Sequence, residues 1–162
     1  MSQNGKHLVI VESPAKARTI GKYLGAGYEV AASVGHVRDL PTKELGVDVE
    51  HGFEPKYVTI HGKGKIIADL KKRARGKDSV ILATDPDREG EAIAYHVAEQ
   101  LGYEKDRARF RRVTFREITK GAVESALANP GDLDLRKIEA QQARRILDRL
   151  VGYKVKIGRA HV

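Results

Sequence analysis

The segment SVILATDPDREGE, residues 79–91, joins an apolar run to four acidic residues. Residues 80–83 carry only apolar side chains, which is typical of a short strand buried on both faces of a parallel sheet. Asp85, Pro86 and Asp87 end this run, and residues 89–101 have the composition of a helix. The segment therefore predicts a buried strand, an acidic loop and a helix, which is the repeating unit of α/β folds.

The chain begins with the same order of elements. Residues 7–12, HLVIVE, form another apolar run that ends in an acid. Ser13 is a candidate N-cap, and Pro14 suits the first position of a helix that runs to about Leu24. Further strands are expected at residues 28–33, 57–60 and 111–115, further helices at 63–75, 119–127 and 134–151, and loops with little regular structure at 34–55. This alternation predicts an α/β fold with a mainly parallel sheet.

The last expected helix, residues 134–151, carries apolar residues at helical spacing. We expect one of its faces to pack inward for that reason. The face consists of Ala143, Ile146, Leu147, Leu150 and Val151. Arg145 and Arg149 lie on a different side of the helix.

Composition limits the classes of protein that this chain can belong to. Its 162 residues are 41% hydrophobic and 32% charged, as expected for one soluble globular domain. The chain has no cysteine and no apolar run of membrane-spanning length, and its polar N-terminus is unlike a secretory signal, so we expect a cytoplasmic protein that does not bind membranes. A net charge of +8 favours a polyanionic partner such as a nucleic acid.

Acidic residues gather where two predicted strands end. Asp85, Asp87, Glu89 and Glu91 follow one strand within seven residues, and Glu12 ends another. Ligands of open parallel sheets bind at the carboxyl ends of the strands, so we expect Glu12, Asp85, Asp87 and Glu89 to converge there. Oxygen ligands on an open edge suit Mg²⁺, which also shares phosphate oxygens. The alternative is a solvated turn whose acids cap the following helix.

Four blocks carry a resemblance to a known family. They are residues 8–16 (LVIVESPAK), 33–41 (SVGHVRDLP), 85–91 (DPDREGE) and 140–153 (AQQARRILDRLVGY). Together and in this order they resemble the toprim domain of type IA DNA topoisomerases. The form of the first block is closer to bacterial topoisomerase I than to topoisomerase III, and reverse gyrase, which carries a similar module, stays open.

The resemblance implies a toprim fold, with a four-stranded parallel sheet between helices. It also implies an isomerase that relaxes negatively supercoiled DNA with Mg²⁺ and without ATP. Such an enzyme acts as a monomer on a single-stranded segment, which it cleaves, passes and religates through a 5′-phosphotyrosine. The family nucleophile lies in a Tyr-x-Arg-Ser/Thr motif, and none of the tyrosines here has that context: Tyr23, Tyr28, Tyr57, Tyr95, Tyr103 and Tyr153. We therefore expect this chain alone not to relax DNA.

Roles for the acidic cluster follow from the same resemblance. Glu12 is expected to act as a general acid and base near the scissile phosphate, and also to touch the metal. Asp85 and Asp87 are expected Mg²⁺ ligands, with Glu89 as a further contributor. Lys16, in the first or second turn of the helix after Glu12, is expected to hold a phosphate.

Further residues are expected to contact DNA. His36 lies in a glycine-containing loop of the second block. Arg144 and Asp148, four residues apart on one helical side, are expected near the cleavage site and can pair with each other. Arg145 and Arg149 are weaker candidates. The alternative for all four helical residues is a solvated helix surface.

The blocks also suggest a division of the chain. We expect a flexible N-terminus at residues 1–6, a toprim domain at 7–130, and the truncated start of the following domain, with its basic helix, at 131–156. Residues 157–162 read like the translation of a common sequencing adapter, so we expect a non-native tail there.

Two other functions compete with a topoisomerase. A stand-alone toprim nuclease, or a primase-like nucleotidyltransferase, would use the same acids with Mg²⁺ but would not call for the last helix. A non-catalytic nucleic-acid-binding module would rely on the net charge alone, and its binding would be salt-sensitive and indifferent to magnesium.

Overall fold

The computed structural model describes residues 6–160, and the side chains of residues 6–153. Its centre is a four-stranded sheet in the order β2-β1-β7-β8, in which every neighbouring pair is parallel. The strands are β1 (His7–Val11), β2 (Tyr28–Ala32), β7 (Ser79–Leu82) and β8 (Phe110–Arg112). The predicted parallel four-stranded sheet is therefore confirmed.

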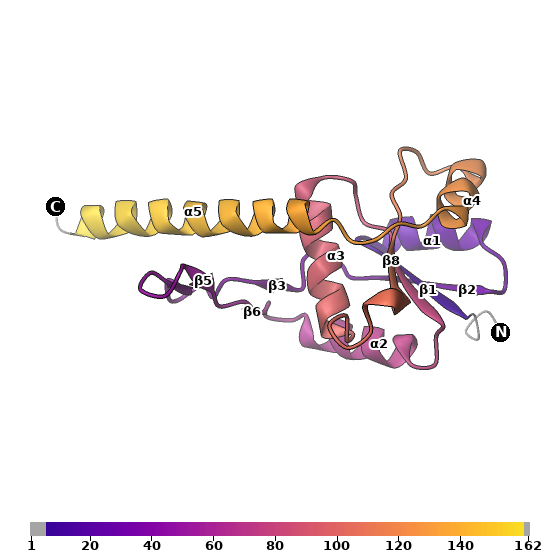
Figure 1. Cartoon of the computed structure of the whole chain (residues 1–162), viewed down its shortest axis with the longest axis horizontal. Helices are drawn as coiled ribbons and strands as arrows, with labels where there is room; N and C mark the ends of the chain where they lie inside the picture. The colour runs from indigo at the N-terminus through magenta and orange to yellow at the C-terminus, as the bar shows by residue number, and fades with distance from the viewer. Residues whose placement is uncertain (1–5, 161–162) are drawn as a thin grey trace.

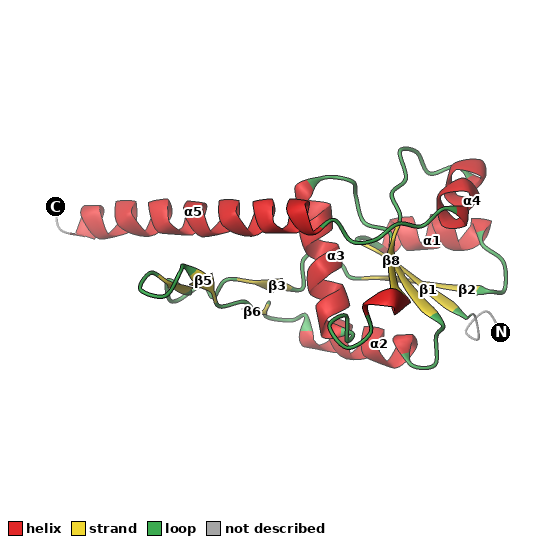
Figure 2. Ribbon diagram, in the orientation of Figure 1, coloured by secondary structure: helices red, strands yellow, loops and turns green. Residues whose placement is uncertain are grey.

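Helices cover both faces of this sheet (Figures 1 and 2). Val9 and Val11 pack with α1 (Pro14–Tyr23) and α4 (Lys120–Ala128), whereas Leu8 and Ile10 pack with α2 (Gly64–Ala74) and α3 (Arg88–Gln100). These four side chains of β1 are fully buried. Each such side chain contributes about 1.5–3 kcal/mol through its removal from water. The sheet is apolar on both faces because a helical layer covers each of them.

The register of the central strands decides where the acidic residues lie. Ile10 of β1 stands opposite Leu82 of β7, so the two strands end side by side. The amide of Ala83 extends the ladder by donating to the Ile10 carbonyl at 2.8 Å. The loops that follow β1 and β7 therefore begin next to each other at one edge of the sheet.

The first helix begins where the sequence predicts. The Ser13 hydroxyl accepts a hydrogen bond from the Lys16 amide at 3.2 Å, and Pro14 occupies the first turn. The N-cap satisfies one of the amides that a helix start leaves without a partner. This cap fixes Lys16 one turn away from Glu12.

Residues 34–55 hold more regular structure than expected. β3 (Arg38–Asp39) pairs with β6 (Val58–Thr59), and β4 (Val47–Asp48) pairs with β5 (Glu54–Pro55), both in antiparallel fashion. Gly52 lies in the turn between β4 and β5 with a φ of 76°, which glycine adopts without strain. Strands of two residues leave no alternating pattern, so the sequence signal is absent. The predicted strand at 57–60 is confirmed as β6.

Helix α5 (Leu135–Ala160) extends out of the α/β body, next to the β3–β6 pair (Figure 1). Its start is anchored by Ile138, which is 3% exposed. The expected inward face is only partly observed, because Ile146 and Leu150 are half-buried, whereas Ala143 is exposed and Leu147 and Val151 are 59% and 55% exposed. Within the described residues, Leu147 and Val151 are left largely uncovered.

Some expectations fall at the ends of the chain. Residues 1–5 of the expected flexible N-terminus lie outside the described residues, as do residues 161 and 162 of the expected non-native tail. The backbone of residues 157–160 continues α5. None of the helices in residues 6–160 combines the length and hydrophobicity needed to cross a bilayer.

Candidate active site

Glu12 and Asp85 meet at the carboxyl ends of β1 and β7. The Asp85 amide donates to Glu12 Oε2 at 3.0 Å. The Lys16 ammonium donates to Asp85 Oδ1 at 2.7 Å and also to Glu12 Oε1. The structure thus brings three of the predicted site residues into one cluster, which we call the Glu12–Lys16–Asp85 cluster.

The electrostatics of this cluster keep Lys16 charged. Partial burial lowers the pKa of the Lys16 ammonium, but hydrogen bonds to Asp85 and Glu12 and the charges of both carboxylates together raise it above its usual value. The Glu12 side chain is 15% exposed, whereas that of Asp85 is 53% exposed. The cluster therefore presents two carboxylates and one ammonium at the protein surface, with access for a ligand on the Asp85 side.

Asp87 and Glu89 make their contacts outside the Glu12–Lys16–Asp85 cluster. Asp87 caps α3, since its Oδ1 accepts a hydrogen bond from the Gly90 amide at 2.6 Å. Glu89 is exposed and lines a pocket with His36. Across the described part of the chain, no three acidic or histidine side chains gather closely enough to hold a metal ion. The expected convergence is therefore observed for Glu12 and Asp85, and metal roles for Asp87 and Glu89 stay predictions.

Asp87→Ala should lower the free energy of unfolding by about 1 kcal/mol, because α3 loses its N-cap. Urea denaturation followed by circular dichroism measures this change. Thr119→Ala is the matched control, since Thr119 caps α4 by accepting from the Ala122 amide at 3.2 Å. A capping role for Asp87 would be wrong if its variant kept wild-type stability while Thr119→Ala lost the expected amount.

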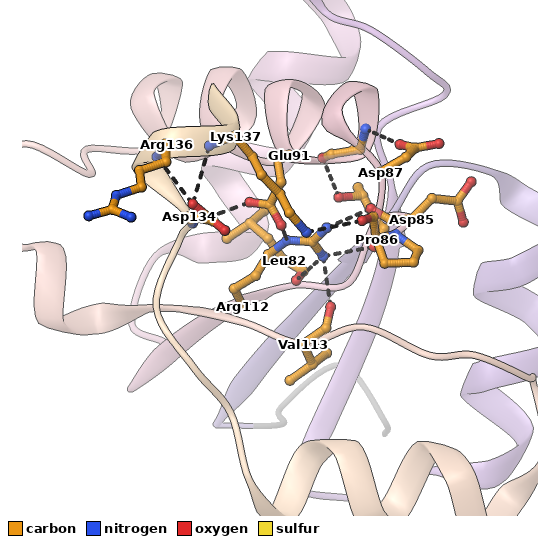
Figure 3. A network of polar contacts seen from close by, with 12 residues as sticks. Leu82, Asp85, Pro86, Asp87, Glu91, Arg112, Val113, Asp134, Arg136 and Lys137 are labelled. Carbon is orange, nitrogen blue, oxygen red and sulfur yellow. Dashed lines mark hydrogen bonds and ion pairs between the residues drawn. The ribbon is translucent and has the colours of Figure 1, made fainter. Parts of the chain in front are cut away.

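A buried arginine, Arg112, binds the loop that carries Asp85 (Figure 3). Arg112 of β8 is 6% exposed, and its Nε donates to Glu91 Oε1 at 2.7 Å. Its other N–H groups donate to backbone carbonyls around the loop, those of Leu82, Thr84, Asp85 and Val113. The guanidinium group thereby joins β7, β8 and the loop that presents Asp85.

A close backbone contact fixes the same loop. A Cβ atom on Gly90 would lie 1.9 Å from the Asp85 carbonyl oxygen, which no side chain can do without moving the backbone. The Thr84 hydroxyl donates to the Gly90 carbonyl at 2.6 Å and closes the turn. The loop between Thr84 and Gly90 is therefore held in one conformation by glycine, threonine and the guanidinium beneath it.

Comparison with known proteins shows which family has this architecture. Residues 7–118 match the Toprim domain, a span that includes the whole sheet and the Glu12–Lys16–Asp85 cluster. The chain belongs to the Toprim domain family. The predicted toprim fold is thereby confirmed.

A solved structure extends the similarity beyond the Toprim domain. The chain is similar to full-length topoisomerase I from Thermotoga maritima, with a TM-score of 0.84 and 47% sequence identity. The similar region covers 91% of this chain and 25% of the Thermotoga protein. This chain therefore spans about a quarter of that relative, and the similar region extends into the part of the chain that contains α5.

Two arginines of α5 bind the last residue of β3 and the segment that follows it. Arg145 donates to both carboxylate oxygens of Asp39, at 2.8 and 3.0 Å. Burial alone would raise the pKa of Asp39, but the hydrogen bond from Arg145 and the amide of Leu40 hold it below its usual value. Arg149 donates to the carbonyls of Pro41, Glu44 and Leu45. Both guanidinium groups are thus bonded within the protein, and DNA contact by either stays a prediction.

Arg144 and Asp148 differ from Arg145 and Arg149 in their exposure to solvent. Both are exposed, and within the part of the chain that the structure describes they do not form the ion pair that their spacing allows. His36 is half-buried and lines the pocket of about 280 Å³ that also contains Glu89, Asp39 and Arg145. Of the predicted DNA contacts, Arg144 is the cation most open to solvent.

Sequence reasoning missed the residues that support the Toprim site. Arg112 lies in β8 next to another arginine, Arg111, and a buried cation of this kind requires a carboxylate partner. Glu91 lies four residues after Asp87, on the inward side of α3, where it is 2% exposed. The signals for the Arg112–Glu91 pair are an arginine within a predicted strand and a glutamate on the apolar face of a predicted helix. Neither signal names the partner.

Proposed function

We propose that this chain is the acid–base and cation-binding part of a type IA DNA topoisomerase. Such an enzyme relaxes negatively supercoiled DNA by cleaving one strand, passing DNA through the break and religating it through a 5′-phosphotyrosine. The observation that carries this proposal is the meeting of Glu12, Lys16 and Asp85 at one sheet edge. Its support from comparison is the Toprim domain and the similarity to Thermotoga topoisomerase I.

In this function, Glu12 moves the proton of the reaction. Its carboxyl group would protonate the 3′ oxygen that leaves the phosphate, and would take the proton back during religation. The Asp85 amide, bonded to Glu12 Oε2, orients the carboxylate for this transfer. Lys16 would stabilise the negative charge that grows on the phosphate oxygens, as preorganised cations do in phosphoryl transfer.

Mg²⁺ is the proposed cofactor, and Glu12 and Asp85 are the residues that would hold it. The donor set fits, because Mg²⁺ is commonly bound by one or two carboxylates together with water and phosphate oxygens. The two carboxylates already share one cation, the Lys16 ammonium. Asp87 and Glu89 are proposed as additional contributors. When bound, the ion would offset charge on the phosphate.

DNA is the proposed partner, along a path beside α5. Arg144 and Asp148 are exposed there, and His36 lines the neighbouring pocket. Arg145 and Arg149 would contact DNA from positions in which they also hold residues 39–45. The net charge of +8 agrees with a polyanionic partner.

The division of the chain remains part of this proposal. We infer a toprim domain at residues 7–130 and the start of a following domain at 131–156, because α5 runs out of the α/β body (Figure 1). A monomeric state and a cytoplasmic location stay predictions.

A plasmid relaxation assay tests the proposed function. A full-length enzyme carrying this segment should relax negatively supercoiled plasmid with Mg²⁺ alone, and EDTA should abolish the activity. Asp85→Asn should reduce the rate by at least about tenfold, because one carboxylate of the cation site is lost. Asp106→Asn, an exposed aspartate elsewhere, should keep the wild-type rate. An unchanged rate in Asp85→Asn would contradict the role of the cluster.

The same assay separates the competing functions. Magnesium-dependent nicking by the 162-residue chain itself, lost in Asp85→Asn, would favour a stand-alone toprim nuclease. DNA binding without cleavage, insensitive to magnesium and to Asp85→Asn, would favour a non-catalytic module.

A further inference from the structure

Lys16 occupies the space between the two carboxylates of the cluster. Its ammonium bonds to one oxygen of Glu12 and one oxygen of Asp85, which belong to different strand–loop connections of the sheet. No other cation bridges Glu12 and Asp85 among the described residues. A single lysine therefore balances one of the two negative charges and holds the two loops together.

A divalent cation that bridged Glu12 and Asp85 at the position of Lys16 would take Glu12 Oε1 and Asp85 Oδ1, the oxygens that the ammonium now binds. The Lys16 ammonium and a divalent cation repel each other. Each would bind the carboxylate oxygens that lie between Glu12 and Asp85. The ammonium and the divalent cation would therefore compete for the position between the two carboxylates. The outcome is decided by which cation binds the pair more favourably, not by a rearrangement of the fold.

We propose that Lys16 is an intramolecular counter-ion that holds Glu12 and Asp85 together in the metal-free protein and leaves them when a divalent cation binds. The released ammonium then becomes available to a phosphate oxygen of DNA. The inference rests on the proposed function of the same cluster. It adds that cation binding and the availability of Lys16 are coupled.

The surroundings of Lys16 allow this exchange. The backbone of Lys16 stays fixed, because its amide is bonded to the Ser13 side chain at the start of α1. Its side chain is 34% exposed, so four flexible carbons can carry the ammonium toward solvent. Glu12 keeps its bond from the Asp85 amide, and Arg112 keeps its bond to the Asp85 carbonyl at 2.6 Å. The Glu12 carboxylate and the backbone that carries Asp85 therefore keep these bonds when Lys16 departs.

Mg²⁺ affinity measured by isothermal titration calorimetry on the 162-residue chain tests the proposal. Lys16→Met should bind Mg²⁺ about three- to tenfold more tightly than the wild type, because no internal cation has to leave two ion pairs. Lys16→Arg keeps the charge and should bind no more tightly than the wild type. Lys22→Met removes the same charge from the last turn of the same helix, and controls for the change in net charge.

A second measurement uses the unmodified sequence. The side-chain Hε–Cε resonance of Lys16, assigned by NMR, should shift during a Mg²⁺ titration with the midpoint found by calorimetry, whereas that of Lys22 should not. Mg²⁺ binding that leaves the Lys16 resonance unchanged would overturn the proposal, and so would equal or weaker affinity in Lys16→Met. In either case the metal assignment of the proposed function would stand. Absence of saturable Mg²⁺ binding in every variant would instead remove that assignment, and this inference with it.

Discussion

Glu12→Gln in the full-length enzyme is expected to slow DNA cleavage about 10²–10⁴-fold, the usual contribution of a positioned general acid or base. Glutamine has nearly the same size, and its carbonyl oxygen can still accept from the Asp85 amide. The amide group cannot donate and recover a proton as a carboxyl group does. The fold should therefore survive while the chemical step fails. Single-turnover cleavage of an end-labelled single-stranded oligonucleotide measures the rate.

A matched variant separates this effect from a general loss of charge. Glu124→Gln removes an exposed acid from α4, on the Toprim domain but away from the cluster, and should cleave at the wild-type rate. Circular dichroism should give the same spectrum for both variants. A Glu12→Gln enzyme that cleaves as fast as Glu124→Gln would rule out acid–base work by Glu12.

Arg112→Met should lower the free energy of unfolding by about 3–5 kcal/mol, as found when one partner of a buried ion pair is removed. Glu91 would remain buried at 2% exposure without its cation, and the carbonyls that Arg112 binds would lose their donor. Methionine fills much of the space, so the loss reports the charge and the hydrogen bonds more than a cavity. Urea denaturation of the 162-residue chain measures the change.

Two further variants show whether the buried pair is the cause. Arg111→Met changes the preceding residue, which is half-buried and bonds to the Pro130 carbonyl, and should cost much less. The double variant Arg112→Met with Glu91→Leu should recover part of the stability, because no buried charge is left alone. If the free energy of unfolding of Arg112→Met lies within about 1 kcal/mol of the wild-type value, the guanidinium does not hold the loop.

The parts of the fold that the sequence predicts well have a local origin. The two central strands, β1 and β7, show as apolar runs, and the helix start at Ser13 and Pro14 depends on neighbouring residues alone. The meeting of Glu12 with Asp85 was predictable for a different reason. Parallel strands that lie side by side bring their carboxyl ends to one edge, whatever the details of packing.

The rest depends on contacts that no local pattern encodes. Asp87 is equally suited to bind a metal or to cap a helix, and only the three-dimensional structure shows that it bonds to the Gly90 amide. The sequence around Arg145 is that of a solvated helix surface. Its partner, Asp39, lies more than a hundred residues away in the sequence, so the ion pair shows only in the folded structure. The apolar side of α5 has the spacing of a core face, although the described chain leaves Leu147 and Val151 exposed.

The Glu91 carboxylate joins the start of α5 to the central sheet. Glu91 accepts from Arg112 through Oε1 and from the Asp134 amide, just before α5, through Oε2 at 3.3 Å. The long rod of α5 is thus fastened at its root to the same group that steadies the acidic turn. Through Arg112, which also donates to the Asp85 carbonyl at 2.6 Å, Glu91 connects the start of α5 with the loop that carries Asp85.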